Sequence, residues 1–228
     1  FIAADGYLYN GKKHQRTEEI NAIIAALPCL KDTLVIPYIG TALDFDDTGI
    51  TKYTSLADGE SGPPSFVAVP FNHPLWILYS SGTTGAPKAI THSHGGCLLE
   101  HLKYLAFHND VHEGERFFWF TTTGWMMWNF LQGSMLLGAT IILYDGSPGY
   151  GGLDRLWKLS EQLDIQHFGT SAPFLVACMK EKIQPGLHYN LKGLRSIGST
   201  GSPLPPEAFQ WVYDHIHERV WLCSMSGG

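Results

Sequence analysis

Short apolar runs alternate along the chain with longer segments in which apolar residues recur at every third or fourth position. The first pattern predicts buried strands, and the second predicts helices with one apolar face. Glycine and proline residues separate many of these segments, as is typical of element ends. The predicted strands are 5–12, 33–39, 75–80, 116–121, 140–146, 165–171, 194–199 and 219–223. The predicted helices are 16–27, 96–107, 128–137, 153–163, 173–182 and 206–216.

This alternation predicts an α/β fold with mostly parallel sheets flanked by helices, because parallel neighbours need a crossover helix between them. Most strands after residue 75 are almost continuously apolar, which predicts a sheet covered on both faces. Residues 40–73 differ in character, since they are rich in Gly, Asp, Thr, Ser and Pro. We expect them to form an irregular surface excursion, either an insertion or a tether.

The segment SSGTTGAPK, residues 80–88, lies between an apolar strand and AITHSH, which predicts a second strand before the next helix. Glycines at 82 and 85 allow backbone conformations that direct several N–H groups into one concavity, which suits phosphate oxygens. The hydroxyl residues add donors, and Lys88 adds a positive charge. The segment is not a Walker A loop, because Pro87 replaces the second glycine and no helix opens at the lysine. From composition alone, a flexible linker or a hairpin turn explains it about equally well.

Composition narrows the classes of function. The chain has 228 residues, enough for a core in one large or two small domains, and a formal net charge of −6. This charge provides no basic field for nucleic acid, and no apolar run approaches the roughly 20 residues of a membrane span. The four cysteines are far apart and form no C-x-x-C pair. We therefore expect reduced thiols and a cytoplasmic protein.

All nine residues of SSGTTGAPK agree with the pattern S/T-S/T-G-S/T-S/T-G-x-P-K, and the segment resembles the phosphate loop of the adenylate-forming acyl-CoA synthetases. The resemblance runs from about residue 72 to residue 228, and DGYLYNGKKH near the start fits it too. The strings FNHPLWILYSSGTTGAPKAITHSHGGCLLEHLK, GSTGSPL and SMSGG look like the acetoacetyl-CoA synthetase branch. The resemblance implies that residues 1–228 are part of a large N-terminal AMP-binding domain, with the small C-terminal domain absent. The start without Met and the stop just after a strand also predict a piece of a longer protein.

Members of this family make acyl-CoA in two steps: a carboxylate attacks the α-phosphate of ATP, and the thiol of CoA then displaces AMP. The resemblance therefore implies small-molecule partners, namely ATP, CoA and a carboxylic acid, with Mg²⁺ as cofactor. The implied acid is acetoacetate, and a short- or medium-chain acyl-CoA synthetase with another acid is the alternative. A non-catalytic nucleotide-binding module is the alternative of a different class. We expect the isolated 228 residues to form no acyl-adenylate.

The resemblance also implies roles for particular residues. The residues implied at the β- and γ-phosphates are Ser80, Ser81, Gly82, Thr83, Thr84, Gly85 and Lys88. A mobile, donor-rich loop suits this role, because it can fold over the phosphates and later release pyrophosphate. Those implied at the adenine face are Gly201, Ser202 and Pro203, although acetyl-specific relatives carry an acidic residue at the Ser202 position. An ordinary turn before a helix is the alternative for that segment.

The acid is expected beside TTTGWMMWN, residues 121–129. By resemblance Trp125 lines the acyl pocket and is, with Lys88, a catalytic candidate, while Met126 and Met127 form the pocket wall. Core packing is the alternative, since Trp and Met fill cores well. Thr200 and Gly227 are also implied at the substrate. Acetyl-specific relatives have a tryptophan at the Gly227 position, so its absence favours an acid longer than acetate.

No metal ligand is expected within the chain, because the family's Mg²⁺-binding acidic residue falls beyond residue 228. His92 and His94 form an H-x-H pair without a third ligand nearby, so placement at a helix entry is favoured over a metal site. Thr170 or Ser171 is expected to cap a helix, with a contact to the acyl group as the alternative.

Overall fold

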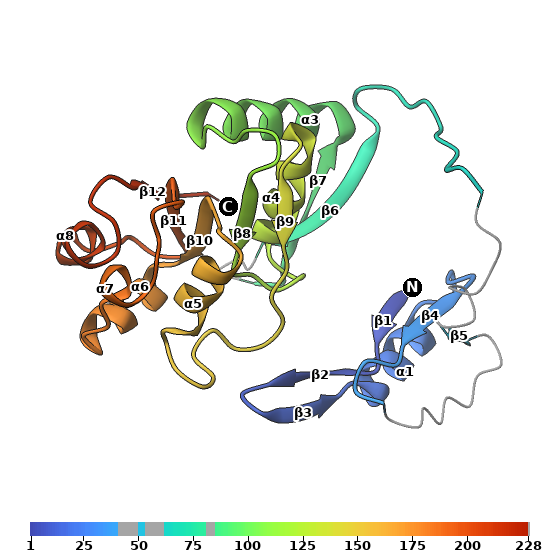
Figure 1. Cartoon of the computed structure of the whole chain (residues 1–228). Coiled ribbons are helices and arrows are strands. Elements are labelled where there is room, and N and C mark those ends of the chain that lie inside the picture. Colours follow the sequence, from blue (N-terminus) through green and yellow to red (C-terminus); the bar gives the residue numbers. More distant parts are fainter. Residues whose placement is uncertain (41–49, 53–61, 81–84, 228) are drawn as a thin grey trace. The chain divides into compact units, whose positions relative to one another are not determined.

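The computed structural model describes residues 1–40, 50–52, 62–80 and 85–227. The chain divides into two compact units. The first comprises Phe1–Val67 and Asp145–Tyr150, and the second comprises Ala68–Tyr144 and Gly151–Gly228. Figure 1 shows the elements of both units, which are described separately below.

The first unit is built on a small parallel sheet. Strands β1 (Ile2–Ala4), β4 (Thr33–Ile36) and β5 (Ile50–Lys52) pair in the order β1-β4-β5. Helix α1 (Thr17–Ala26) precedes β4 in the chain and lies close to its predicted position. The three-residue strands β1 and β5 were not predicted, and β5 lies within the segment expected to be irregular. Residues 62–73 contain no helix or strand, as predicted, whereas 41–49 and 53–61 lie outside the described residues.

The predicted single strand at 5–12 is wrong, because this segment contains a turn. Strands β2 (Gly6–Tyr9) and β3 (Lys12–Gln15) form an antiparallel hairpin. Asn10 and Gly11 connect them with φ angles of 50° and 74°. Two consecutive left-handed residues are typical of the tight hairpin turn that favours Asn-Gly.

The second unit contains a five-stranded sheet in the order β12-β11-β10-β8-β9. All four neighbouring pairs are parallel, which confirms the predicted α/β architecture. The strands are β8 (Arg116–Trp119), β9 (Thr140–Ile142), β10 (His167–Ser171), β11 (Ser196–Thr200) and β12 (Trp221–Ser224). A separate antiparallel hairpin consists of β6 (Pro74–Ser80) and β7 (Lys88–Ser93).

Helices connect these strands and cover the sheet. They are α3 (His94–Lys103), α4 (Met126–Gly133), α5 (Arg155–Gln162), α6 (Ala172–Lys180), α7 (Pro185–His188) and α8 (Pro206–His215). A π-helical turn at Tyr104–His108 extends α3, and a 3-10 turn at Ser134–Leu137 extends α4. The short α7 was not predicted, and both α3 and α4 begin two residues earlier than predicted. The early start of α3 is explained by Ser93, whose Oγ accepts a hydrogen bond from the Gly96 amide and caps the helix.

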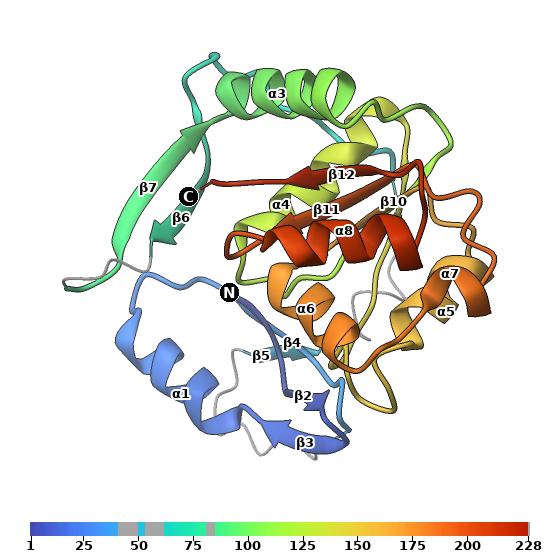
Figure 2. The same cartoon turned by 90° about the vertical axis from the view of Figure 1, so that its left-hand side faces the viewer.

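Both faces of the sheet are buried, as predicted. Phe118, Phe168 and Ile197 pack with residues of α5, α6 and α8 in one cluster. Phe117 and Trp119, the neighbours of Phe118 in β8, pack with α4 in another. This division follows from the alternation of side chains along a strand. Figure 2 shows α4 on one side of the sheet and α6 and α8 on the other.

Candidate functional site

The glycine- and hydroxyl-rich segment closes the hairpin of β6 and β7. The register of the two strands pairs Ser80 directly with Lys88, so the segment joins strand to strand, as the sequence predicts. Ser81, Gly82, Thr83 and Thr84 lie outside the described residues. Gly85 has a φ of +153°, and no atom lies within 4 Å of a Cβ built on it. A glycine is therefore favoured at 85 by backbone conformation rather than by packing.

Lys88 is exposed at the first position of β7. Within the described part of the chain, no hydrogen bond or ion pair occupies its ammonium group. The ammonium group of Lys88 can therefore bind an anionic ligand without first breaking an ion pair with a carboxylate of the protein.

The expected acid-binding residues lie at the start of α4. Trp125 is the N-cap residue of the helix and is 56% exposed, and Met126 is 49% exposed. Met127 is only 9% exposed and belongs to the cluster around Trp119 and Phe130. The structure thus gives Met127 the core-packing position that was the alternative interpretation, and it leaves Trp125 and Met126 open to a ligand.

The turn after β11 carries the residues expected at adenine. The Thr200 hydroxyl donates a hydrogen bond to the carbonyl of Met225 at 3.1 Å, which ties the end of β11 to the segment after β12. Gly201 follows with a φ of +88°, a left-handed conformation that favours glycine. Ser202 and Pro203 are exposed. Gly227 is the last residue that the structure describes, three residues after the end of β12.

The topology brings several of these residues to one edge of the sheet. Thr200 is the last residue of β11, and Trp125 and Gly227 follow the carboxyl ends of β8 and β12. Ligands of open α/β sheets bind at this edge. In Figure 2 the chain beyond β12 runs toward β6, which belongs to the loop-bearing hairpin of the same unit.

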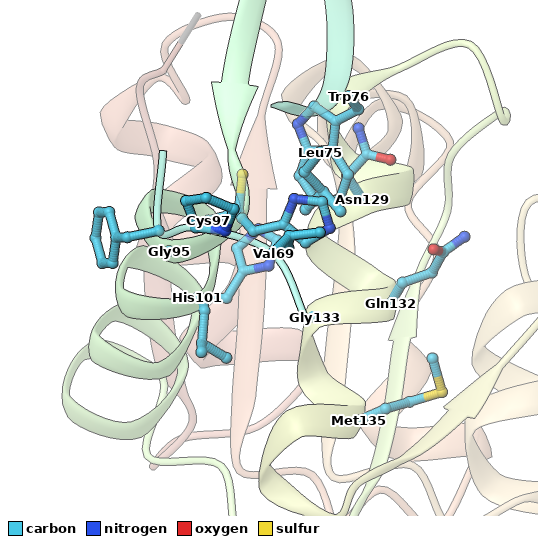
Figure 3. A pocket seen from close by; sticks show the side chains of 14 residues that line it. Val69, Leu75, Trp76, Gly95, Cys97, His101, Asn129, Gln132, Gly133 and Met135 are labelled. Carbon is cyan, nitrogen blue, oxygen red and sulfur yellow. The ribbon is translucent and has the colours of Figure 1, made fainter. Parts of the chain in front are cut away.

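A cavity of about 500 Å³ lies elsewhere in this unit, between β6, α3 and α4. Figure 3 shows Cys97 and His101 of α3 on one side and Asn129, Gln132 and Met135 on the other. Burial lowers the pKa of His101, which favours its neutral form. None of the predicted site residues lines this cavity. We therefore take the strand ends and the hairpin, rather than this cavity, as the candidate site.

Thr170 and Ser171 were expected to cap a helix. Ser171 is the N-cap of α6, and its Oγ accepts a hydrogen bond from the Phe174 amide, which confirms the capping prediction. Thr170 is buried, and its hydroxyl has no hydrogen-bond partner among the described residues. The two side chains alternate along β10, so they point to opposite faces of the sheet.

A polar network that the sequence did not reveal lies at the opposite, amino edge of the sheet. His167 is buried and contacts Ser196 Oγ through Nδ1 and Glu115 Oε2 through Nε2, both at 2.8 Å. Arg195 pairs with both Glu115 and Asp110. The order Ser–His–Glu is that of a hydrolase triad, but Ser196 is 3% exposed and lies away from the ligand-binding edge. The network joins the amino ends of β10 and β11 to Glu115, the residue before β8.

The network shifts two ionisation equilibria. Burial lowers the pKa of His167 and outweighs the Glu115 hydrogen bond, which raises it. Burial raises the pKa of Glu115, but hydrogen bonds from His167, the His112 amide and Arg195 outweigh it and bring this pKa below its ordinary value. Neutral His167 beside ionised Glu115 is the favoured state near neutral pH.

Other expectations concern metals, membranes and thiols. Across the described ranges, no group of three or more His, Cys, Asp or Glu side chains is placed to hold a metal ion. None of the helices in those ranges is both long and apolar enough to cross a bilayer. All four cysteines are free.

The chain matches the family model described as AMP-binding enzyme over residues 7–223. It is 44% identical over 231 aligned residues to the acetoacetyl-coenzyme A synthetase of Rhizobium meliloti (strain 1021), covering 100% of this chain and 35% of that protein. It is 40% identical over 234 aligned residues to the acetoacetyl-CoA synthetase of Gallus gallus, with the same coverage of each chain.

A solved structure shows the same fold. The acetoacetyl-CoA synthetase from Streptomyces lividans superposes with a TM-score of 0.92 at 44% sequence identity, covering 100% of this chain and 35% of that one. The chain thus spans about a third of the length of the curated relatives it matches. Since the family model covers nearly the whole sequence, the chain belongs to the AMP-binding enzyme family.

Proposed function

We propose that the full-length gene product is an ATP-dependent acid–thiol ligase that converts acetoacetate to acetoacetyl-CoA. In the first step an acetoacetate oxygen attacks the α-phosphorus of ATP, which forms acetoacetyl-adenylate and releases pyrophosphate. In the second step the sulfur of CoA attacks the acyl carbon, and AMP leaves with the bonding electron pair. The observation that carries the proposal is the pairing of Ser80 with Lys88, because it closes a nine-residue phosphate-loop pattern into a hairpin.

The loop of this hairpin, Ser80 to Lys88, is proposed to bind the β- and γ-phosphates of ATP. Adenylyl transfer depends mainly on positioning and on electrostatic stabilisation of phosphate oxygens. Lys88 is exposed and supplies a compact positive charge, while Gly85 has a conformation that other residues rarely adopt. Phosphate binding here would use loop amides and one ammonium, without the helix N-terminus of a P-loop.

The acid is proposed to lie beside Trp125 and Met126, the two exposed residues that start α4. Thr200 lies on another strand end at the same edge, and the turn from Gly201 to Pro203, which begins at the left-handed Gly201, would face adenine. By resemblance, Gly227 supports an acid longer than acetate, because acetyl-specific relatives carry a tryptophan at this position and a bulky side chain there would narrow the pocket. The match to three acetoacetyl-CoA synthetases supports the choice of acetoacetate.

Mg²⁺ is proposed as the cofactor that accompanies ATP. Among the described residues, no group of three or more His, Cys, Asp or Glu side chains is placed to hold it. The reaction and the four free thiols suit a reducing, cytoplasmic setting. CoA is proposed as the second substrate.

The test is ATP–pyrophosphate exchange by the full-length gene product with acetoacetate, acetate, butyrate and hexanoate. This assay reports adenylate formation before CoA enters. We expect exchange to be fastest with acetoacetate. Exchange with acetate and none with acetoacetate would reject the proposed acid. No exchange with any acid, together with measurable ATP binding, would favour the non-catalytic nucleotide-binding alternative.

A further inference from the structure

Trp119 lies across its neighbouring strands in a space that two glycines leave open. The sheet register aligns Trp119 of β8 with Gly169 of β10, and Gly169 with Gly198 of β11. A Cβ added to Gly169 would lie 2.0 Å from Cδ2 of the indole, and one added to Gly198 would lie 2.3 Å from Cη2. Real side chains do not approach this closely, so the indole needs glycine at both positions.

The same indole packs against the segments that flank the proposed acid site. Trp119 is 4% exposed and meets Phe130 of α4 edge-to-face, with ring centroids 5.5 Å apart. Its cluster also includes Met127 from the first turn of α4 and Met225 from the segment after β12. In sequence, Trp125 lies two residues before Met127, and Gly227 lies two residues after Met225.

The register also places Trp119 beneath Thr200. Thr200 follows Gly198 by two positions on β11, so both positions are on the same face of the sheet. Thr200 is one step closer to the carboxyl edge, where ligands bind. A molecule that reached past Thr200 along this face would therefore meet the indole.

We propose that Trp119 is a specificity-determining positioning residue, which forms the floor of the acid pocket and limits the length of the acid. The inference rests on the proposed function, since it assumes an acid beside Trp125. Shortening this side chain would deepen the pocket along the sheet face and admit additional methylene groups. The preferred acids would then be longer, unbranched aliphatic carboxylates.

The experiment measures kcat/KM in ATP–pyrophosphate exchange for hexanoate and for acetoacetate, and takes their ratio. We expect Trp119→Ala to raise this ratio roughly tenfold or more, since one methylene in an apolar pocket changes discrimination by about 10- to 200-fold. The KM for ATP should stay within about twofold of the wild-type value. Trp119→Phe should raise the ratio less and is the informative variant if Trp119→Ala does not fold.

Two further variants test whether Trp119 acts as the floor of the acid pocket or only contributes to core packing. Gly198→Ala should push the indole of Trp119 away from β11. The hexanoate-to-acetoacetate ratio should then fall, whereas Trp119→Ala should raise it. Trp157→Phe is the matched control, because Trp157 is fully buried against Phe168 in the cluster on the other face of the sheet. It should leave the ratio unchanged even if stability falls.

The outcomes distinguish this inference from the proposed function. If the wild type shows no exchange with any acid, the proposed function fails and the inference fails with it. If the wild type activates acetoacetate but neither substitution of Trp119 moves the ratio beyond that of Trp157→Phe, the inference alone is overturned.

Discussion

Ser80 pairs with Lys88 across the antiparallel hairpin of β6 and β7, so the two ends of the phosphate-loop pattern are held side by side. Lys88 therefore begins a strand, whereas the lysine of a P-loop opens a helix. The donors available to an anion here are the amides and hydroxyls between the two strands and the ammonium of Lys88. We therefore expect the affinity for a polyphosphate to depend on the backbone conformation of the loop between Ser80 and Lys88.

Gly85→Ala should weaken ATP binding without disturbing the fold. A residue with a Cβ is strained by about 1–3 kcal/mol in such a conformation, and no packing contact would be gained or lost at this exposed position. We expect the KM for ATP in exchange to rise roughly tenfold. The matched control is Gly114→Ala, since Gly114 also has a positive φ and open space but precedes β8. Equal KM values for ATP in Gly85→Ala and Gly114→Ala would contradict the proposed phosphate-binding role of the loop.

Gly227→Trp should shift acid preference from acetoacetate toward acetate. By resemblance, a tryptophan occupies this position in acetyl-specific relatives, and an indole here would fill volume proposed to hold the acid. We expect the acetate-to-acetoacetate ratio of kcat/KM to rise about tenfold or more. Gly227→Ala, which adds one methyl group, should change the ratio little. If Gly227→Trp leaves the acetate-to-acetoacetate ratio of kcat/KM unchanged, Gly227 does not line the acid pocket.

The His167 network should make the fold sensitive to acid. The folded pKa of His167 lies below its unfolded value, so the unfolded chain binds the proton first as pH falls below about 6.5. The folded pKa of Glu115 is also lowered, and its contribution is present above about pH 4.5 and lost as pH falls further. Stability should therefore decrease progressively from pH 7 to pH 4.

Thermal unfolding of the chain at several pH values checks this prediction. His167→Gln should lower the unfolding temperature at pH 7 and flatten its decrease between pH 7 and pH 5.5. His188→Gln is the control, because His188 is exposed on α7. A His167→Gln curve parallel to that of the wild type over this range would show that His167 does not cause the acid sensitivity.

The sequence predicted the parallel sheet, its helices and the strand-to-strand loop, because these follow from local periodicity and from a contiguous motif. Local signals were weaker elsewhere. The strand predicted at 5–12 is a hairpin, although Asn10-Gly11 is a recognised turn signal. The strands β1 and β5 are three residues each, too short for a periodic pattern.

The positions of the two methionines could not be predicted for a geometric reason. Met126 and Met127 are consecutive in helix α4, so their side chains point in directions about 100° apart and only one of them can face the core. Met127 is therefore in the core and Met126 is exposed. The packing of Trp119 over Gly169 and Gly198 was hidden as well, because it depends on the register of strands that are far apart in the sequence.

The central claim is that the hairpin loop binds the phosphates of ATP, and calorimetric titration of ATP into wild type and Lys88→Ala tests it most directly. A hydrogen bond to a charged group contributes about 1.5–3 kcal/mol, so we predict a Kd at least tenfold higher for Lys88→Ala. Lys103→Ala removes an exposed lysine that pairs with Glu100 on α3 and should bind ATP as the wild type does. If Lys88→Ala and the wild type bind ATP with the same Kd, the phosphate-binding role of the loop is contradicted.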